Sequence, residues 1–242
     1  MQFEAILFDC DGVLVDSEPI TLGALRHMLN AAGWAISAEE CQRIFIGKTV
    51  RSETARIERE TGQPLTDAWM TAFYALRDQG LHAHLHAIPG AVDAVRQCHA
   101  LLGGKIAVAS GADKAKVLMQ LDKVGLLPLF DPHIFSGHDL PRTKPFPDVY
   151  LAAAASLQRD PRRCLVIEDA LPGLQAGLAA GATVWGYCPL EGGHTTPQAL
   201  LAAGAQRVLR DMGELPGLLR QAGGPTYNST QATLAAMKND DA

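Results

Sequence analysis

The sequence contains neither a long apolar run nor a basic run. No stretch approaches the roughly 20 apolar residues of a membrane-spanning helix, and a strand pattern begins almost at once, without the charged flank and apolar segment of a secretory leader. The 26 acidic and 21 basic residues give a formal net charge of -5, which argues against nucleic acid or an anionic membrane as a partner. We therefore expect a soluble protein that is not exported.

Cysteine is scarce and scattered. The five cysteines are odd in number and form no C-x-x-C pair, so the sequence supports neither a disulfide framework nor a zinc site. This usage fits the reducing environment of the cytoplasm. A chain of 242 residues that is 48% hydrophobic can bury a substantial core without such supports, and its length suits one large domain or a core with an inserted small one.

A long helical segment follows the first strand pattern. Residues 5–8 form a short apolar run, and no further convincing strand pattern occurs before residues 105–109. Four helical patterns fill the interval. They lie at residues 19–32, at 50–61, at 66–81 and, between the first two, in a segment that begins at a capping box formed by Ser37 and Glu40. We expect residues 16–87 to form an inserted, all-helical cap that acts as a lid.

From residue 88 onward the chain alternates helical and strand patterns. A helical pattern over 91–102 is followed by strand patterns at 105–109, 133–135, 164–167 and 183–187, with a weaker one at 207–209. This alternation implies right-handed crossovers and a doubly wound, mostly parallel sheet, which is a Rossmann-like α/β fold. We assign residues 1–15 and 88–222 to this core and expect the polar tail at 223–242 to be loosely ordered.

Two carboxylates follow the first strand. Asp9 and Asp11 stand where the apolar run ends, and Gly12 lets the backbone turn. The carboxyl edge of a parallel sheet is where ligands bind, and two carboxylates at this spacing can share one divalent cation. Asp9 could attack phosphorus as a covalent nucleophile, and Asp11 could protonate the leaving oxygen and later activate water. Taken alone, the D-x-D-G pattern is equally consistent with an acidic turn after a strand.

Further polar residues follow later strand patterns. Ser110 and the amide of Gly111 could hold a phosphate oxygen near a helix N-terminus. Lys144, fixed before a proline, could neutralise a phosphate. Glu168 and Asp169 offer oxygen ligands that suit Mg2+. Each has an ordinary alternative, namely a turn or a helix cap for the serine and the acidic pair, and a solvated loop for the lysine. Their joint occurrence at successive strand ends favours the functional interpretation.

The ordered set of motifs resembles the haloacid dehalogenase superfamily of phosphohydrolases, in the helical-cap subgroup that includes β-phosphoglucomutase and sugar-phosphate phosphatases. The matching segments are DCDGVLVDSEP (9–19), VASG (108–111), KPFPDVY (144–150) and VIEDALPGLQAGLAAG (166–181). The resemblance implies Asp9 as nucleophile and metal ligand, and Asp11 as general acid/base that ligates the metal through its carbonyl. It implies Ser110 and Lys144 as phosphate binders and Asp169 as a Mg2+ ligand, with Glu168 assisting directly or through water.

The resemblance also implies the reaction. We expect a Mg2+-dependent phosphatase that hydrolyses a small phosphomonoester, a sugar phosphate or phosphorylated sugar acid, through an aspartyl-phosphate. True dehalogenases of this fold lack the acid found here at Asp11, which disfavours dehalogenation. The alternative is a β-phosphoglucomutase-type isomerase, although Thr21 stands where such mutases typically carry a histidine. A phosphate-binding regulatory protein with an inert site is a third interpretation, because fold alone does not establish activity.

We expect the cap to decide which substrate binds. The sequence leaves open the identity of that substrate. It also leaves open the oligomeric state, for which a monomer is the default. Lys48 and Arg51 occupy the segment that corresponds to the substrate-specificity loop of the family, and they could bind an anionic arm of the substrate or be solvated cations.

Other polar residues favour structural interpretations. His82, His84 and His86 lie at the hinge between cap and core without acidic partners, which favours a solvated hinge over a metal site. Several residues near the core loops are interpreted as surface or loop-fixing groups: Lys123, His133, His138 and Arg142. Asp139 and Asp148 are candidate carboxylates in the outer surroundings of Lys144.

Overall fold

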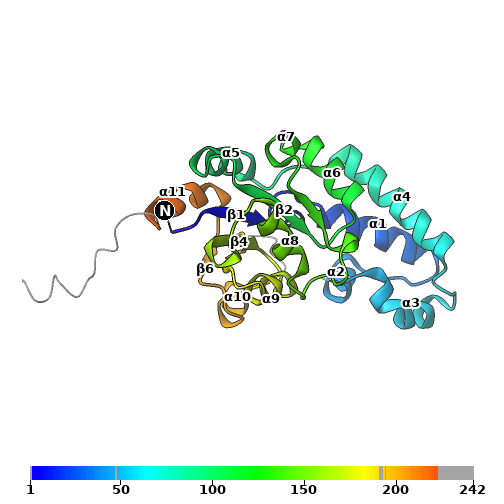
Figure 1. The fold of residues 1–242 in the computed structure, drawn as a ribbon. Helices are drawn as coiled ribbons and strands as arrows, with labels where there is room; N and C mark the ends of the chain where they lie inside the picture. Colours follow the sequence, from blue (N-terminus) through cyan, green and yellow to red (C-terminus); the bar gives the residue numbers. More distant parts are fainter. Residues whose placement is uncertain (1, 47, 191–192, 194, 223–242) are drawn as a thin grey trace, which may run out of the picture.

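In a computed structural model, a parallel sheet forms the centre of the protein (Figure 1). The structure describes residues 2–46, 48–190, 193 and 195–222, so the predicted tail at 223–242 lies outside the described residues. Within them the strand order is β3-β2-β1-β4-β5-β6. The strands are β1 (Ala5–Phe8), β2 (Ile106–Ser110), β3 (Ile134–Ser136), β4 (Cys164–Glu168), β5 (Thr183–Tyr187) and β6 (Arg207–Leu209). The predicted doubly wound α/β fold is confirmed.

Alternate residues of each strand enter hydrophobic clusters on opposite faces of the sheet. In β1, Ile6 and Phe8 join one cluster, whereas Ala5 and Leu7 join the other. The first face is covered by α5 (Ala91–Leu101), α6 (Lys114–Lys123), α7 (Leu127–Phe130) and α11 (Leu215–Gln221). The second is covered by α8 (Asp148–Ser156), α9 (Leu171–Ala179) and α10 (Pro197–Ala202), as Figure 1 shows. Burial on both faces explains why the central strand β1 is continuously apolar.

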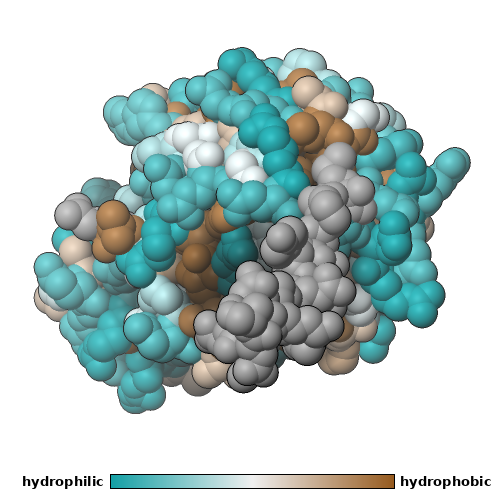
Figure 2. Space-filling view, turned by 90° about the vertical axis from the view of Figure 1, so that its left-hand side faces the viewer, coloured by the Kyte–Doolittle hydropathy of each residue, from teal (hydrophilic) through white to brown (hydrophobic). Residues whose placement is uncertain are grey.

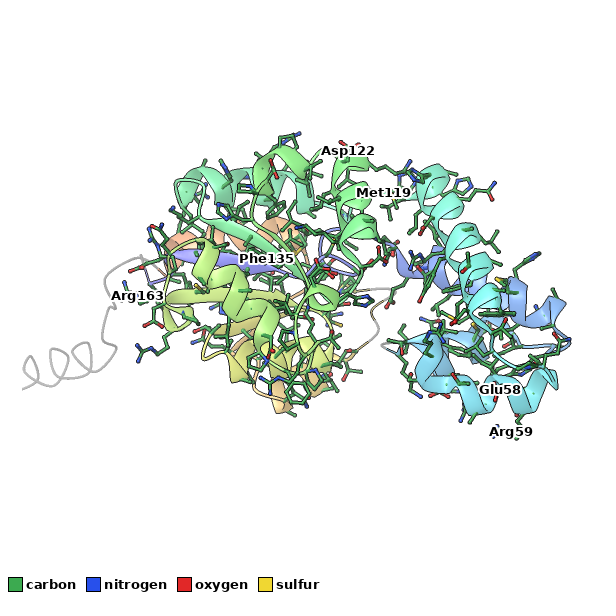
Figure 3. The ribbon with its side chains drawn as sticks, turned by 45° about the vertical axis from the view of Figure 1, so that its right-hand side comes forward. Glu58, Arg59, Met119, Asp122, Phe135 and Arg163 are labelled. Atoms are coloured by element: carbon green, nitrogen blue, oxygen red, sulfur yellow. The ribbon has the colours of Figure 1, made fainter. Side chains whose placement is uncertain are left out.

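Most of the stretch between β1 and α5 forms a helical insert beside the sheet. Its α-helices are α1 (Glu18–Ala31), α2 (Ala38–Phe45), α3 (Thr54–Thr61) and α4 (Asp67–His84). They enclose a cluster of their own, to which Leu29, Ile57 and Phe73 belong. Figure 3 shows the insert as a separate lobe, with Glu58 and Arg59 on the side away from the sheet. An inserted cap agrees with this arrangement, and its boundaries at residues 16 and 87 stay a prediction.

Local capping decides where the insert helices begin. The Ser37 side chain accepts a hydrogen bond from the backbone N–H of Glu40 at 3.1 Å, which gives α2 its predicted start. The prediction of one helix over 50–61 is wrong in detail, because a 3-10 turn at Val50–Glu53 precedes α3. Thr49 caps that turn by accepting from the backbone N–H of Ser52. The helical segment thus begins at its predicted residue, with a 3-10 first turn before α3.

The outer surface is mostly polar on the side of the molecule away from the insert. Figure 2 shows hydrophilic side chains over most of this face, with hydrophobic ones in smaller groups between them. In the part of the chain that the structure describes, no helix combines the length and the apolar character needed to cross a bilayer. Most large hydrophobic side chains of the described residues lie between the sheet and its helices or inside the insert.

Candidate active site

The carboxyl ends of three neighbouring strands bring the predicted residues together. Asp9 follows β1, and its backbone N–H donates to the carbonyl of Ile167 at 3.0 Å. Ser110 ends β2, and Glu168 ends β4. Because β2 and β4 flank β1 on opposite sides, these residues stand at the switch point where open α/β sheets bind ligands. A cavity of about 380 Å3 lies here, lined by the strand ends and by residues of α1 and α4.

Lys144 joins two of the carboxylates. Its Nζ lies 2.6 Å from Oδ1 of Asp9 and 2.6 Å from Oε1 of Glu168, and its side chain is only 9% exposed. Burial alone would lower the pKa of Lys144, but Asp9 and Glu168 raise it well above its ordinary value. The ammonium therefore stays charged at neutral pH and holds the Asp9 carboxylate in place.

Glu168 is held by donors on both of its oxygens. Oε1 accepts from Lys144 and, at 2.8 Å, from the buried hydroxyl of Tyr150. Oε2 accepts from the backbone N–H groups of Asp169 and Ala170, at 3.1 and 3.2 Å. The first turn of α9 also needs Gly173, because a Cβ there would lie 1.6 Å from Oε1 of Glu168. The protein thus fixes this carboxylate from every side, and in doing so it fixes Lys144.

Asp9, Glu168 and Asp169 form a buried acidic cluster. One carboxylate oxygen from each lies within 4.8 Å of the others. Burial raises the pKa of Asp9 to about 7: the attraction and hydrogen bond of Lys144 lower it and repulsion from Glu168 and Asp11 raises it, but Lys144 does not cancel the effect of burial. Burial, with repulsion from Glu168 and Asp9, also raises the pKa of Asp169 well above its ordinary value. So much negative charge in a buried site, all of it on hard oxygen donors, is what a Mg2+ ion stabilises.

Gly12 allows Asp169 to approach this cluster. Its φ of +79° is in the left-handed region, and a Cβ there would lie 2.1 Å from Oδ2 of Asp169. Any other residue would be strained and would also displace the carboxylate. The glycine of the D-x-D-G segment is therefore required by the turn and by the close contact.

Asp11 has a different environment from Asp9. Its Oδ1 accepts hydrogen bonds from the hydroxyl of Ser17, from Nζ of Lys116 at 2.8 Å and from Nε2 of Gln120 at 2.9 Å. Burial raises the pKa of Asp11, but Lys116 and these hydrogen bonds more than offset it and lower the pKa to about 2. The two aspartates, two residues apart, therefore hold protons at very different pH.

Ser110 and Gly111 line the cavity beside Asp9. The Ser110 side chain accepts from the backbone N–H of Ala112 at 3.0 Å, so it also makes the ordinary turn contact expected of a serine after a strand. The carbonyl of Ala112 accepts from Ser136 Oγ at 2.7 Å, which ties this turn to the end of β3. The hydroxyl is thus oriented, and its own proton can be donated to a ligand.

The insert contributes some of the expected residues and one unexpected residue. Lys48 lines the cavity and pairs with Glu53 at 2.6 Å. Arg51 is not among the described residues that line the cavity; it pairs instead with Asp67 at 2.5 Å. Arg77 of α4, which the sequence did not single out, lines the cavity with a side chain only 10% exposed.

Polar residues around the site make local contacts of their own. Asp148 pairs with Arg142 at 2.9 Å, whereas Asp9 and Glu168 occupy the ammonium of Lys144. A place for Asp148 in the outer surroundings of Lys144 stays a prediction. Nδ1 of His133 lies 3.1 Å from Ser156 Oγ at the end of α8, and Nζ of Lys123 in α6 donates to the carbonyl of His82 in α4. Within the described ranges, the histidines at the hinge belong to no group that could hold a metal.

Comparison with known proteins identifies the family. A family model described as haloacid dehalogenase-like hydrolase matches residues 3–181. The chain is 29% identical to the 6-phosphogluconate phosphatase of Escherichia coli over 188 residues, which cover 77% of this chain and 83% of that protein. This protein belongs to the haloacid dehalogenase-like hydrolases.

Solved structures agree with this assignment. A haloacid dehalogenase family hydrolase from Deinococcus radiodurans, with bound phosphate and sodium, is 33% identical and superposes with a TM-score of 0.78 over 92% of this chain and 97% of that one. A putative β-phosphoglucomutase from Thermotoga maritima is 24% identical, with a TM-score of 0.74 over 90% of this chain and 99% of that one. The second likeness shows a shared fold.

Proposed function

We propose that this protein is a Mg2+-dependent phosphatase that hydrolyses a small phosphomonoester, a sugar phosphate or phosphorylated sugar acid, through an aspartyl-phosphate. The observation that carries the proposal is the contact of 2.6 Å between Asp9 and Lys144 in a cavity that Asp11 also lines. A carboxylate that is oriented by a buried ammonium, beside a second carboxylate able to move a proton, has the parts that covalent phosphoryl transfer needs.

The proposed reaction has two halves. In the first, an oxygen of Asp9 attacks phosphorus, the bond from phosphorus to the leaving oxygen breaks, and Asp11 gives that oxygen a proton. In the second, water attacks the aspartyl-phosphate, Asp11 takes a proton from the water, and the carboxylate of Asp9 is released. The hydroxyl of Ser110 and the amide of Gly111 bind phosphoryl oxygens, while Lys144 offsets their negative charge.

The charge state of Asp11 must change during this cycle. With its pKa lowered to about 2, mainly by Lys116 acting against burial, the side chain is ionised before substrate binds. A phosphate ester that enters the cavity adds negative charge beside Lys116, and nearby negative charge raises the pKa of a carboxylate. Substrate binding therefore favours the protonated form that the first half-reaction needs.

The acidic cluster fits Mg2+. Asp9 and Asp169 would hold the ion through their carboxylates and Asp11 through its carbonyl. Because protein donors engage both oxygens of Glu168, we favour its assistance through water. When bound, the ion supplies positive charge that offsets the charge of the phosphoryl group and of the cluster.

The cavity favours a small anionic metabolite over a macromolecule. Its volume of about 380 Å3 lies within the roughly 300–1,000 Å3 common for small-molecule sites. Lys48 and Arg77 add positive charge to the part of the lining that the insert contributes, and the relative named 6-phosphogluconate phosphatase supports a phosphorylated sugar acid. Closure of the insert would exclude bulk water, and we expect this activity in the cytoplasm.

Phosphate release is the test of this proposal. The protein with Mg2+ is given sugar phosphates, phosphorylated sugar acids and phosphoglycolate, in parallel with β-glucose 1-phosphate and its bisphosphate activator. Chelator-sensitive release that Asp9→Asn abolishes is the expected result, with the exposed Asp93→Asn as a matched control. Full activity of Asp9→Asn would contradict the mechanism. Conversion of the sugar phosphate without net release would indicate a mutase, and silence in both assays would favour a regulatory protein.

A further inference from the structure

One face of α6 carries a row of polar side chains directed at Asp11 and at the insert. Lys116 and Gln120 stand one helical turn apart, so they project from the same face, and both donate to Asp11. Gln120 occupies a position between the buried Val117 and Leu121 where an apolar residue would be expected, and it is completely buried. A polar amide in that place requires specific partners.

The amide of Gln120 has one orientation that satisfies both of its neighbours. An ionised carboxylate only accepts hydrogen bonds, so Nε2 must face Asp11, where it lies 2.9 Å from Oδ1. Oε1 then faces the thiol of Cys10, which donates to it with a separation of 3.6 Å. The side chain of Gln120 is thus fixed by hydrogen bonds to Cys10 and Asp11, which are consecutive residues in the turn after β1.

All of these contacts fall on one oxygen of Asp11. Ser17, Lys116 and Gln120 donate to Oδ1, and within the described residues no hydrogen bond engages Oδ2. The Lys116 side chain is only 8% exposed, so its ammonium is held at the carboxylate and is not a mobile surface charge. Oδ2 is the oxygen left to exchange a proton in the cavity, and the contacts to Oδ1 set the direction in which it points.

Helix α6 is itself anchored to the insert. Its N-cap residue Asp113 pairs with Arg77 of α4 at 3.5 Å, and Lys123 near its end donates to the carbonyl of His82. Figure 3 shows α6, on which Met119 and Asp122 are labelled, beside α4. The helix that holds Asp11 is therefore supported from both the sheet and the insert.

We propose that Lys116 and Gln120 are positioning residues that orient Asp11 so that Oδ2 delivers its proton to the leaving oxygen. This inference rests on the proposed phosphatase function and adds to it the residues that make Asp11 an effective acid. It predicts that Lys116→Met and Gln120→Met lose much activity on esters whose leaving oxygen requires a proton, and little activity on esters whose leaving group departs without one.

The test compares substrates with different leaving groups. The ratio kcat/KM reports the first half-reaction, in which an alkoxide from a sugar phosphate requires protonation and p-nitrophenolate does not. General acid catalysis contributes about 100-fold or more, so both variants should lose about 100-fold on the sugar phosphate and about threefold or less on p-nitrophenyl phosphate. Lys114→Met, an exposed lysine on the same helix, is the matched control and should match the wild type on both substrates.

A second readout follows the other role of Asp11. If its orientation is disturbed, attack of water on the aspartyl-phosphate also slows, so Lys116→Met should show a burst of p-nitrophenol before a slower steady state. Lys116→Arg keeps the charge and should recover part of the sugar-phosphate activity. A loss of equal size on both substrates, or no loss on either, would overturn the inference.

Failure of the inference can be told from failure of the proposed function. If the wild type turns over no phosphate ester in a chelator-sensitive way, the proposed function fails, and this inference fails with it. If the wild type is active but the variants show no dependence on the leaving group, only the inference fails. Should Lys116→Met not fold, as judged by circular dichroism, Gln120→Met provides the same comparison without removing a charge.

Discussion

Replacement of Lys144 by methionine tests how the buried charges are balanced. The ammonium of Lys144 lies 2.6 Å from carboxylate oxygens of both Asp9 and Glu168. The side chains of Lys144 and Asp9 are each 9% exposed, and that of Glu168 is 1% exposed. Breaking a buried ion pair by removing one partner costs about 3–5 kcal/mol, and this change removes the partner of two carboxylates. We expect Lys144→Met to lose at least that much of its free energy of unfolding at pH 8, in the absence of Mg2+.

The loss should depend on pH in a defined direction. Burial already raises the pKa of Asp9 to about 7, and without Lys144 it must rise further. A carboxyl group whose folded pKa lies above its unfolded value favours folding when protonated, and that contribution disappears as pH rises through the folded pKa. The variant should therefore approach the wild type at pH 5.5 and fall furthest below it at pH 8, where added Mg2+ should restore part of the loss.

Urea unfolding followed by far-ultraviolet circular dichroism at the two pH values measures this directly, with the exposed Lys114→Met as the control for loss of a lysine. Activity should fall by at least about 100-fold, as when a charge-stabilising donor is removed. A loss below about 1 kcal/mol at pH 8, against the roughly 3–5 expected for a broken buried pair, would refute the reasoning, as would equal losses at both pH values.

Three further predictions follow from the same cluster. Gly12→Ala adds left-handed strain of about 1–2 kcal/mol and a Cβ that would lie 2.1 Å from Oδ2 of Asp169, so calorimetry should show weaker Mg2+ binding and a lower Tm; unchanged binding would contradict the contact. Tyr150→Phe removes the donor at 2.8 Å from Glu168 and should cost about 1.5–3 kcal/mol in urea unfolding. Mg2+ should bind more tightly at pH 8 than at pH 6, releasing protons, because Asp9 has its pKa raised to about 7; calorimetry in two buffers tests the proton release.

Much of the fold follows from local pattern. The apolar runs at 5–8 and 183–187 match β1 and β5, and the capping pair Ser37 and Glu40 marks the start of α2. These features depend on residues that are neighbours in sequence. The helix expected over 50–61 has the correct start, which Thr49 caps, but its first four residues form a 3-10 turn instead of an α-helix.

The candidate site was predictable only in part. The resemblance pointed to Asp9, Asp11, Ser110, Lys144 and Asp169, and the structure brings all of them to one sheet edge around one cavity. It did not point to Lys116, Gln120, Tyr150 or Arg77, which act through contacts with residues distant in the chain. Gln120 alone left a signal, as a polar residue on the apolar face of its helix.

The sequence by itself determined which residue types stand at the ends of the strands, because strands and the turns after them depend on residues that are close together in the sequence. Only the tertiary structure decided which charges meet. Asp9 and Asp11 are two residues apart, yet one is paired with Lys144 and has its pKa raised to about 7, while the other is paired with Lys116 and has its pKa lowered to about 2. Strand order and burial set these pairings, and charge interactions depend on distance and burial in space.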